Sequence, residues 1–440
     1  MFSSKYNYYY ESQIFNTRQK SHIVLPVELV SKIKTNDFSV IPDSLLEILR
    51  IMGMILDDNI DEKKLTRFWF FQKNLSSEVG ITFLPTYACN CKCIYCFEDG
   101  LRQPPAKSLM NPSEFQDKFL TWVAELIKAI QPQFLDFAFH GGEPLLATKF
   151  LWEIGQGVNK LADFNNAKKL FSIVTNGTLL NKNNISELLR LNVHKALITL
   201  DGPQIIHDQR RSFKNGKGTY ELILKNMKMA LNMGMEVNLG INFDKMNFEQ
   251  IPSLFSILCD EGFSHFKNFN IIFGAVKRGL TQSQPEYFMK NEMNMDDTAR
   301  CAISLYRLAL DYGLPIVDPV AIGLCTMRKS WVFMVDREGK VFKCITMVGR
   351  KESYVGNISE PIELLFQRVS QFSMLIPWET NQQCEECIYM PLCLGGCSEQ
   401  SLVNKGNISE VDCQKGYYDY FLPNSLDLRQ RRLKQLSIER

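Results

Sequence analysis

Histidine, membrane-length apolar runs and a charge excess of one sign are all scarce in this sequence. Its 440 residues include five histidines, and 50 lysines and arginines nearly balance 48 aspartates and glutamates, so the net charge is +2. A nearly neutral chain gives no general argument for nucleic acid or an anionic membrane as a partner. No apolar run reaches the length of a membrane span. Residues 1–10 lack the apolar core of a secretory signal. We therefore expect a cytoplasmic protein with no nucleic-acid or membrane partner.

Cysteine, in contrast, is abundant, with 13 residues. Cytoplasmic thiols stay reduced, which argues against a disulfide scaffold and favours metal or cluster binding. With so few histidines, thiolate-rich ligation is favoured over mixed zinc sites. The hydrophobic share of 45% and charged share of 22% are typical of a soluble globular chain. A chain of this length should form two or three domains.

Three of the cysteines follow an apolar segment, residues 81–86, that is predicted to be a strand. Cys89, Cys93 and Cys96 have the spacing Cys-x3-Cys-x2-Cys. Three thiolates on one short loop can bind three corners of a cubane iron–sulfur cluster and leave the fourth iron open. Zinc is the alternative, although a zinc site would need a fourth protein ligand and usually has tighter paired spacing. Cys91 lies outside the spacing and is interpreted as a spectator.

From residue 81 to about residue 274 the pattern alternates between strands and amphipathic helices. The apolar runs bounded by turn residues are 81–86, 134–140, 171–175, 196–200, 236–242 and 266–273. Helical patterns lie between these runs. Six alternations predict right-handed βαβ units and a parallel sheet, so we expect a partial (β/α)6 barrel. The site of such a barrel lies at the C-terminal ends of its strands.

Unusual residues follow four successive predicted strands. The first strand leads into the cysteine loop, and the next three lead into residues 141–144 (Gly-Gly-Glu-Pro), 175–178 (Thr-Asn-Gly-Thr) and 199–203 (Thr-Leu-Asp-Gly-Pro). Glycines let a ligand approach the backbone, and a carboxylate such as Glu143 can accept from an ammonium group. One such motif could be an ordinary turn, but four in register indicate a site.

The cysteine spacing and these strand-end residues resemble those of the radical S-adenosylmethionine enzymes. The resemblance implies a [4Fe–4S] cluster on Cys89, Cys93 and Cys96, with the amino and carboxylate groups of S-adenosylmethionine on the open iron. It implies contacts to S-adenosylmethionine from Tyr95, Gly141, Gly142, Glu143, Asn176, Thr199 and Arg211. Arg210 competes with Arg211 for its role, and a surface ion pair with Asp208 is the structural alternative for either arginine.

A second group of cysteines occupies the last third of the chain. In order these are Cys325, Cys344 with four residues between it and Gly339, the run Cys384-x2-Cys387-x5-Cys393-x3-Cys397, and Cys413. This order resembles the SPASM extension of radical S-adenosylmethionine enzymes, which binds two auxiliary clusters, here expected to be [4Fe–4S]. The resemblance assigns Cys325, Cys344 and Cys397 to the first auxiliary cluster and Cys384, Cys387, Cys393 and Cys413 to the second. Zinc knuckles are the alternative use of such spacings.

The first auxiliary set has three cysteines and is therefore one ligand short. Sulfatase-maturing members of the family have a further cysteine a few residues before the position of Cys325, whereas residues 320–324 here contain none. The open iron could take a substrate thiolate or a fourth ligand that the sequence does not identify.

The chain divides into five predicted parts, which are an N-terminal module (1–78), the barrel (79–275), a connecting segment (276–320), the SPASM domain (321–420) and a basic tail (421–440). Three short strands and three amphipathic helices give the module a winged-helix-like α+β order. It could be a packing cap, or it could recognise a peptide by adding it as a strand to a sheet edge. No basic cluster favours nucleic acid. The tail is expected to be a solvated helix.

The resemblance also implies the chemistry. A reduced cluster cleaves S-adenosylmethionine, and the 5′-deoxyadenosyl radical removes hydrogen from an unactivated C–H bond. The favoured hypothesis is a maturase that installs a thioether or carbon–carbon cross-link in a ribosomally made peptide. Its partners would be the precursor peptide or protein and a one-electron reductant such as flavodoxin or ferredoxin. The alternatives are a sulfatase-maturing enzyme that forms formylglycine and a non-catalytic zinc-binding adaptor. The sequence identifies no catalytic base.

Overall fold

A nine-stranded sheet forms the centre of the larger part of the molecule. The computed structural model describes residues 1–75, 77–101, 110–280, 284–320, 325–373, 379 and 381–438. The strand order is β13-β12-β10-β9-β8-β6-β14-β15-β16. The six barrel strands run parallel and are β6 (Glu78–Leu84), β8 (Phe134–Phe139), β9 (Lys168–Thr175), β10 (Val193–Thr199), β12 (Glu236–Phe243) and β13 (Phe269–Ala275). The predicted partial (β/α)6 barrel is confirmed.

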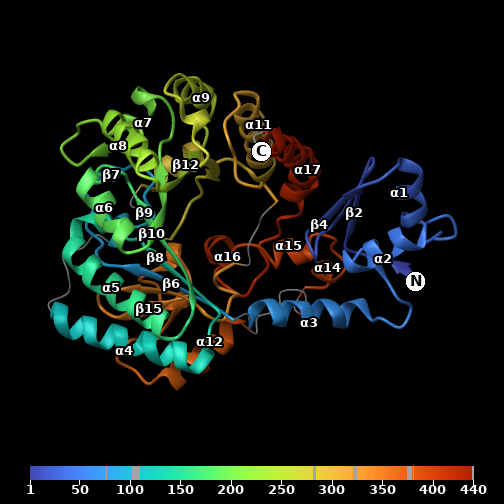
Figure 1. Cartoon of the computed structure of the whole chain (residues 1–440), viewed down its shortest axis with the longest axis horizontal. Coiled ribbons are helices and arrows are strands. Elements are labelled where there is room, and N and C mark those ends of the chain that lie inside the picture. The colour runs from blue at the N-terminus through green and yellow to red at the C-terminus, as the bar shows by residue number, and fades with distance from the viewer. Residues whose placement is uncertain are drawn as a thin grey trace.

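Amphipathic helices cover the outer face of these strands (Figure 1). They are α4 (Pro112–Ile130), α5 (Thr148–Phe164), α6 (Lys182–Arg190), α7 (Gln204–Arg210), α8 (Tyr220–Asn232) and α9 (Ile251–Asp260). Apolar side chains of the helices pack on the sheet, as where the rings of Phe119 and Phe83 lie 5.1 Å apart. Burying apolar area on this face stabilises the barrel and leaves the strand ends to carry polar residues.

The cysteine-rich region continues the barrel sheet. Strand β14 (Val332–Asp336) pairs in parallel with β6, and the antiparallel strands β15 (Lys340–Phe342) and β16 (Tyr354–Asn357) extend it further. The sequence pattern did not predict this pairing. Helices follow at α12 (Ile362–Ser373), α14 (Gln382–Glu385), α15 (Met390–Cys393) and α16 (Ser398–Lys405). The connection before β14 contains α10 (Pro285–Asn291) and α11 (Met295–Asp311). Residues 321–324 lie outside the described residues.

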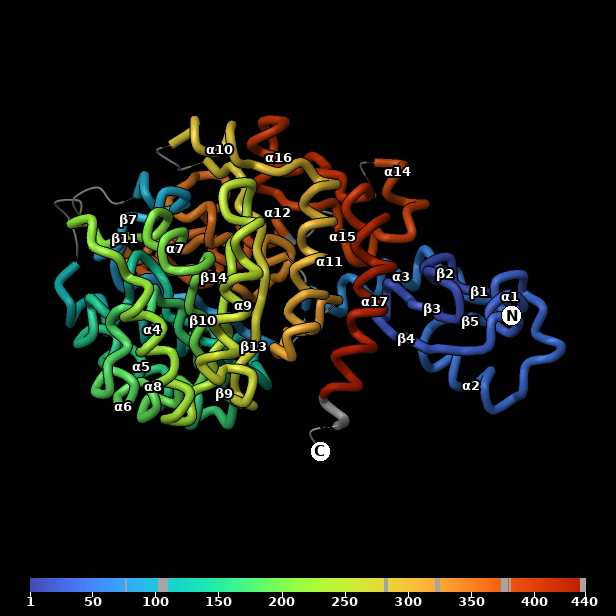
Figure 2. The backbone as a smooth tube through the Cα atoms, turned by 90° about the horizontal axis from the view of Figure 1, so that it is seen from above, coloured from blue at the N-terminus to red at the C-terminus, as the bar shows by residue number. Residues whose placement is uncertain are grey.

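The N-terminal module forms a separate lobe at the opposite end from the barrel (Figure 2). A three-stranded antiparallel sheet has the order β2-β3-β4, made of Asn7–Tyr10, Gln13–Asn16 and Ser21–Val24, and a small pair joins β1 (Phe2–Ser3) to β5 (Ile55–Leu56). The helices are α1 (Val27–Lys34), α2 (Asp43–Ile51) and α3 (Glu62–Asn74). A buried ion pair between Arg18 and Glu62, at 2.9 Å, ties the sheet to α3. The strands β2, β3 and β4 and the three helices match the predicted elements, whereas β1 and β5 were not predicted and β5 interrupts the predicted run of helices.

The C-terminal helix differs from the expected solvated tail. Helix α17 spans Lys415–Ile438 and lies against α11 in both views (Figures 1 and 2). Phe421 and Leu422 are buried in its first half. Arg431 pairs with Asp311 of α11 at 2.6 Å, so acidic partners compensate the basic residues of the tail. No helix in the described ranges is long and apolar enough to cross a membrane.

Candidate active site

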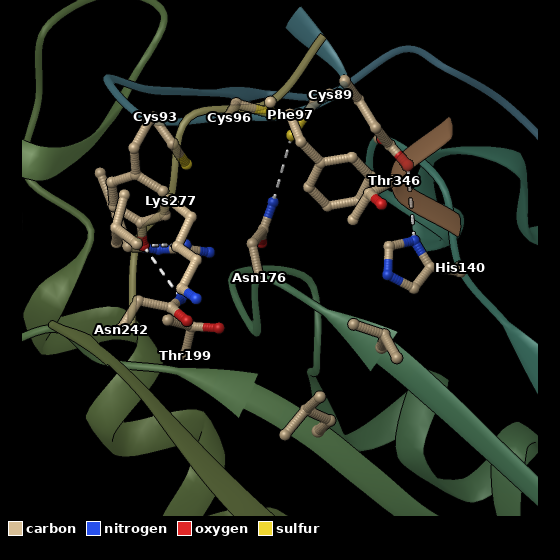
Figure 3. Close-up of a pocket in the computed structure, with 18 of the residues that line it drawn as sticks. Cys89, Cys93, Cys96, Phe97, His140, Asn176, Thr199, Asn242, Lys277 and Thr346 are labelled. Carbon is tan, nitrogen blue, oxygen red and sulfur yellow. Dashed lines mark hydrogen bonds and ion pairs between the residues drawn. The ribbon is translucent and has the colours of Figure 1, made fainter. Parts of the chain in front are cut away.

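A cavity of about 600 Å³ opens at the C-terminal ends of the barrel strands, and we call it the first cavity. Cys89, Cys93 and Cys96 line it, and Figure 3 shows these three cysteines along one side. Its other lining residues include Tyr95, Gly141, Gly142, Asn176, Thr199 and Arg211. The structure thus brings together three predicted cluster ligands and six of the seven residues expected to contact S-adenosylmethionine.

A short antiparallel pair holds the cysteine loop against the fourth strand end. Strand β7 (Cys91–Cys93) pairs with β11 (Arg211–Phe213), and Arg211 lies directly opposite Cys93. Cys91 is buried and is not among the lining residues of the first cavity. Its backbone pairs with that of Phe213, opposite it in β11. This position agrees with the interpretation of Cys91 as a spectator with a structural place in β7.

The two glycines after β8 are required by close packing on the cysteine loop. A Cβ atom on Gly142 would lie 2.3 Å from the backbone oxygen of Ala88, and one on Gly141 would lie 2.4 Å from that of Thr86. Gly141 also has a φ of +111°, a conformation that other residues adopt only with strain. These glycines were predicted to let a ligand approach the backbone, and the structure gives them a packing role as well.

Glu143 is the one expected contact residue that is not among the lining residues of the first cavity. It is fully buried, and its carboxylate accepts from the Thr175 hydroxyl at 2.8 Å, from the Asn176 backbone N–H at 2.8 Å and from the Leu145 N–H at 3.1 Å. Burial raises its pKa to about 7. Glu143 therefore links the second strand end to the third and positions Asn176.

Asn176 connects the third strand end to the cysteine loop. Its side-chain Nδ2 donates to Asn90 Oδ1 at 2.8 Å and lies 3.7 Å from Cys89 Sγ, as the dashed line in Figure 3 shows. Donors to a cluster's sulfur ligands tune the reduction potential of that cluster. This geometry places Asn176 beside the predicted cluster as well as in the first cavity.

The structure separates the roles of the two adjacent arginines. Arg210 is fully buried, and its Nη1 donates to both oxygens of Asp244, at 2.9 and 3.0 Å. Arg211 lines the first cavity, and its Nη1 donates to the Tyr95 hydroxyl at 2.7 Å. The alternative of a surface ion pair with Asp208 is wrong for Arg210. Asp208 instead accepts from the backbone N–H of Thr219 at 2.7 Å.

Several residues of the first cavity were not predicted from the sequence. Asn242 at the end of β12 and Lys277 after β13 line it, and Figure 3 shows both near Thr199. They lie at the ends of the fifth and sixth strands, so the strand-end rule applied to all six strands would have found them. Thr346 and Glu399 also line the cavity but come from the cysteine-rich region, and no local pattern indicates this.

The seven C-terminal cysteines fall into two spatial groups. Burial, followed by the charge of Cys325 among other causes, raises the pKa of both Cys344 and Cys397. Cys325 is therefore close to both. Of this group Cys397 lines the first cavity.

The second group lines a cavity of about 490 Å³, which we call the second cavity. Cys384, Cys387, Cys393 and Cys413 all contribute to it. Aromatic residues of the N-terminal module, Tyr6, Trp69 and Phe70, pack with Met390, Leu394, Cys384 and Cys387 in one apolar cluster. The two groups correspond to the division that the resemblance implies.

The three cysteines of the first loop and the four of the second cavity are donor sets that iron–sulfur clusters use. Among the described residues no three His, Cys, Asp or Glu side chains are placed to hold one metal ion. In a cubane each thiolate binds a different iron, so its ligands stand further apart than those around zinc. The three loop cysteines and the backbone beside Gly141 and Gly142 leave room in the first cavity for a further group on the fourth iron.

Comparison with known proteins agrees with this geometry. Residues 83–257 match the model of the Radical SAM superfamily. The chain is 22% identical over 357 residues to a cysteine-type anaerobic sulfatase-maturating enzyme of Clostridium perfringens, covering 77% of this chain and 95% of that enzyme.

Two solved structures share the fold. Native anSMEcpe with bound AdoMet has a TM-score of 0.64 at 21% identity, covering 80% of this chain and 99% of its own. Streptococcus suis SuiB bound to precursor peptide SuiA has a TM-score of 0.52 at 14% identity, covering 94% of this chain and 99% of its own. Together with the cysteine loop and the strand-end residues of the first cavity, the match over residues 83–257 shows a radical SAM domain in this chain.

Proposed function

We propose that this enzyme is a maturase that forms a thioether or carbon–carbon cross-link in a ribosomally made peptide. The radical SAM superfamily implies S-adenosylmethionine and one [4Fe–4S] cluster. The observation that carries the finer proposal is the N-terminal module. The SuiB structure bound to its precursor peptide covers 94% of this chain, whereas native anSMEcpe covers 80%.

The residues of the first cavity would hold the cofactor in the following way. Cys89, Cys93 and Cys96 would bind the cluster, while Arg211 would pair with the carboxylate of S-adenosylmethionine and Thr199 would donate to it. When bound, S-adenosylmethionine supplies a 5′-deoxyadenosyl radical that removes a hydrogen atom from an unactivated C–H bond. The walls of the cavity would position one substrate hydrogen and exclude water.

The cysteine-rich region would hold two auxiliary clusters. Forming a cross-link removes two hydrogen atoms from the peptide, so one electron and one proton must leave after the radical has taken the first hydrogen atom. A cluster on Cys325, Cys344 and Cys397 beside the first cavity could accept that electron. A second cluster on the four cysteines of the second cavity could carry it onward to a flavodoxin or ferredoxin.

The N-terminal module would bind the peptide. Its strand β4 is at the edge of the three-stranded sheet, and Val24 on it is exposed. An edge strand offers backbone donors and acceptors to an added strand. The module is also fixed to the second cavity, since Thr17 Oγ1 donates to the Ile388 carbonyl at 2.6 Å and Lys5 Nζ donates to that of Glu385 at 3.0 Å. A cap that only packs would use the same contacts, so the two interpretations need a binding experiment.

A second candidate is a sulfatase-maturing enzyme that forms formylglycine. The similarity to the Clostridium perfringens enzyme over 77% of this chain favours it. The missing cysteine before Cys325 and the N-terminal module count against it.

The test is to purify the chain anaerobically and to measure iron, acid-labile sulfide and zinc. We expect about 12 irons per chain, since three four-iron clusters are proposed, and 5′-deoxyadenosine on reduction. Stoichiometric zinc without iron would contradict the proposal and support the zinc-binding adaptor.

Coexpression with a candidate precursor peptide, chosen by searching for a short reading frame next to the gene, then separates the two candidate reactions by mass spectrometry. Cross-linking removes two hydrogen atoms. Formylglycine formation from cysteine also removes two hydrogen atoms, but in addition replaces the thiol sulfur with a carbonyl oxygen, so the mass changes differ. The second candidate would be correct if the precursor peptide is recovered unmodified and a cysteine-containing sulfatase peptide is converted.

A further inference from the structure

A buried carboxyl group lies beside the three-cysteine set of Cys325, Cys344 and Cys397. Glu399 is the second residue of α16, lines the first cavity and has 7% of its surface exposed. Its Oε1 atom has no hydrogen-bond partner among the described residues. An unsatisfied buried carboxyl oxygen is costly, and native proteins hold such groups where they bind a ligand or a metal.

Several contacts hold this carboxyl group close to the sulfur atoms. The Thr346 hydroxyl lies 3.2 Å from Cys344 Sγ, and Thr346 lines the first cavity together with Glu399. Cys397 is the N-cap residue of α16, two positions before Glu399, and lines the same cavity. Glu399 is thus a neighbour of two of the three cysteines.

Other candidate donors are placed elsewhere. Cys259 on α9 is directed to the Tyr312 carbonyl, with its Sγ 3.2 Å from that oxygen. Glu98 Oε1 also has no hydrogen bond among the described residues, but Glu98 lies two residues after Cys96 in the barrel-cluster loop, and its Oε1 is 3.5 Å from His140 Nδ1. Glu399 combines closeness to the three-cysteine set with a donor atom that has no partner in the described part of the chain.

We propose that Glu399 is the fourth protein ligand of the first auxiliary cluster, binding through Oε1 the iron that Cys325, Cys344 and Cys397 leave open. Iron accepts carboxylate oxygen as a ligand in other protein sites. The proposal rests on the auxiliary cluster of the proposed function. The iron bound by Glu399 would then face the first cavity, because Glu399 lines the same cavity as the residues expected to contact S-adenosylmethionine. A substrate thiolate, being a softer ligand, could displace the carboxylate there.

The experiment uses the full-length reconstituted enzyme with saturating S-adenosylmethionine, which covers the open iron of the barrel cluster. The probe is ¹³C-labelled cyanide, a small ligand for any other open iron, detected by its hyperfine coupling in pulsed EPR of the reduced enzyme. Glu399→Ala removes the donor and Glu399→Cys replaces it with a thiolate. Glu410→Ala is the matched control, because Glu410 is exposed in the loop after α16.

We expect ¹³C coupling for Glu399→Ala and none for the wild type, Glu399→Cys or Glu410→Ala. If Glu399→Ala instead loses about four irons while Glu399→Cys keeps them, the assignment is equally supported. Coupling in the wild type as strong as in Glu399→Ala would overturn it, as would the absence of coupling in an iron-replete Glu399→Ala. A Cys325→Ala chain that keeps the iron content of the wild type would mean that no cluster is bound there, and the auxiliary cluster would then fall together with its ligand.

Discussion

The first and second cavities are both lined by cysteines, but different elements complete them. The first cavity combines three cysteines of one loop with polar residues from the ends of the barrel strands and with Cys397. The second cavity has four cysteines, and aromatic residues of the N-terminal module pack against two of them. A set of three thiolates leaves an iron for chemistry, whereas four thiolates close a cluster. Under the proposed function, catalysis would belong to the first cavity and electron transfer to the second.

The largest expected effect comes from breaking the first cavity at its cluster. Cys93→Ala should lose about four irons per chain and should reduce 5′-deoxyadenosine formation to background, because two thiolates of the loop cannot hold the cluster. Iron analysis and chromatography of the reduced enzyme with S-adenosylmethionine measure both. Cys91→Ala, in the same loop, is the control and should keep the iron. Equal iron loss in both variants would show that the loop needs all its cysteines for folding.

The next effect should separate the second cavity from the first. Cys387→Ala should leave S-adenosylmethionine cleavage partly intact and should block formation of the modified peptide, since the proposed electron path is interrupted. The ratio of 5′-deoxyadenosine to peptide product is the measurement. Cys259→Ala, which changes a thiol on α9 away from both cavities, is the control. Full turnover by Cys387→Ala would contradict the proposed role of the second cavity.

Sequence patterns predicted the parts of this molecule that follow local rules. Apolar periodicity predicted a strand at residues 236–242, and β12 spans Glu236–Phe243. The cysteine spacings and the strand-end rule predicted many lining residues of the first cavity, because the C-terminal ends of parallel strands must meet at one edge of the sheet. The six-strand barrel follows from the same reasoning.

The remainder depends on contacts between distant segments. The parallel pairing of β14 with β6 joins Val332 to Gly80, and no local pattern encodes such a register. The basic composition of residues 429–440 predicted a solvated tail, whereas Phe421 and Leu422 bury the start of the same helix. Nor could the motif at residues 141–144 show that Glu143 is directed at Thr175 and Asn176.

The adjacent arginines allow a sharper test within the first cavity. Arg211→Ala should weaken binding of S-adenosylmethionine about ten- to a hundredfold, the usual value of a hydrogen bond to a charged group. Arg210→Ala leaves Asp244 buried without its partner, so the free energy of unfolding should fall by about 3–5 kcal/mol. Equilibrium dialysis and thermal unfolding measure the two effects. If Arg210→Ala instead weakens binding of S-adenosylmethionine and Arg211→Ala lowers the free energy of unfolding, the two roles are exchanged.

The smallest expected effect concerns Glu143, which joins two strand ends behind the first cavity. Burial raises its pKa from 4.5 to about 7, so the carboxyl group binds a proton more tightly in the folded chain. Its stabilising contribution is therefore fully present below the ordinary value and is lost as pH rises through about 7. Glu143→Gln cannot titrate, so the Tm of the wild type should fall relative to that of the variant over this range. Glu221→Gln, at an exposed position of α8, should instead follow the wild type. Parallel profiles for the wild type and Glu143→Gln would show that the proton on Glu143 is not linked to folding.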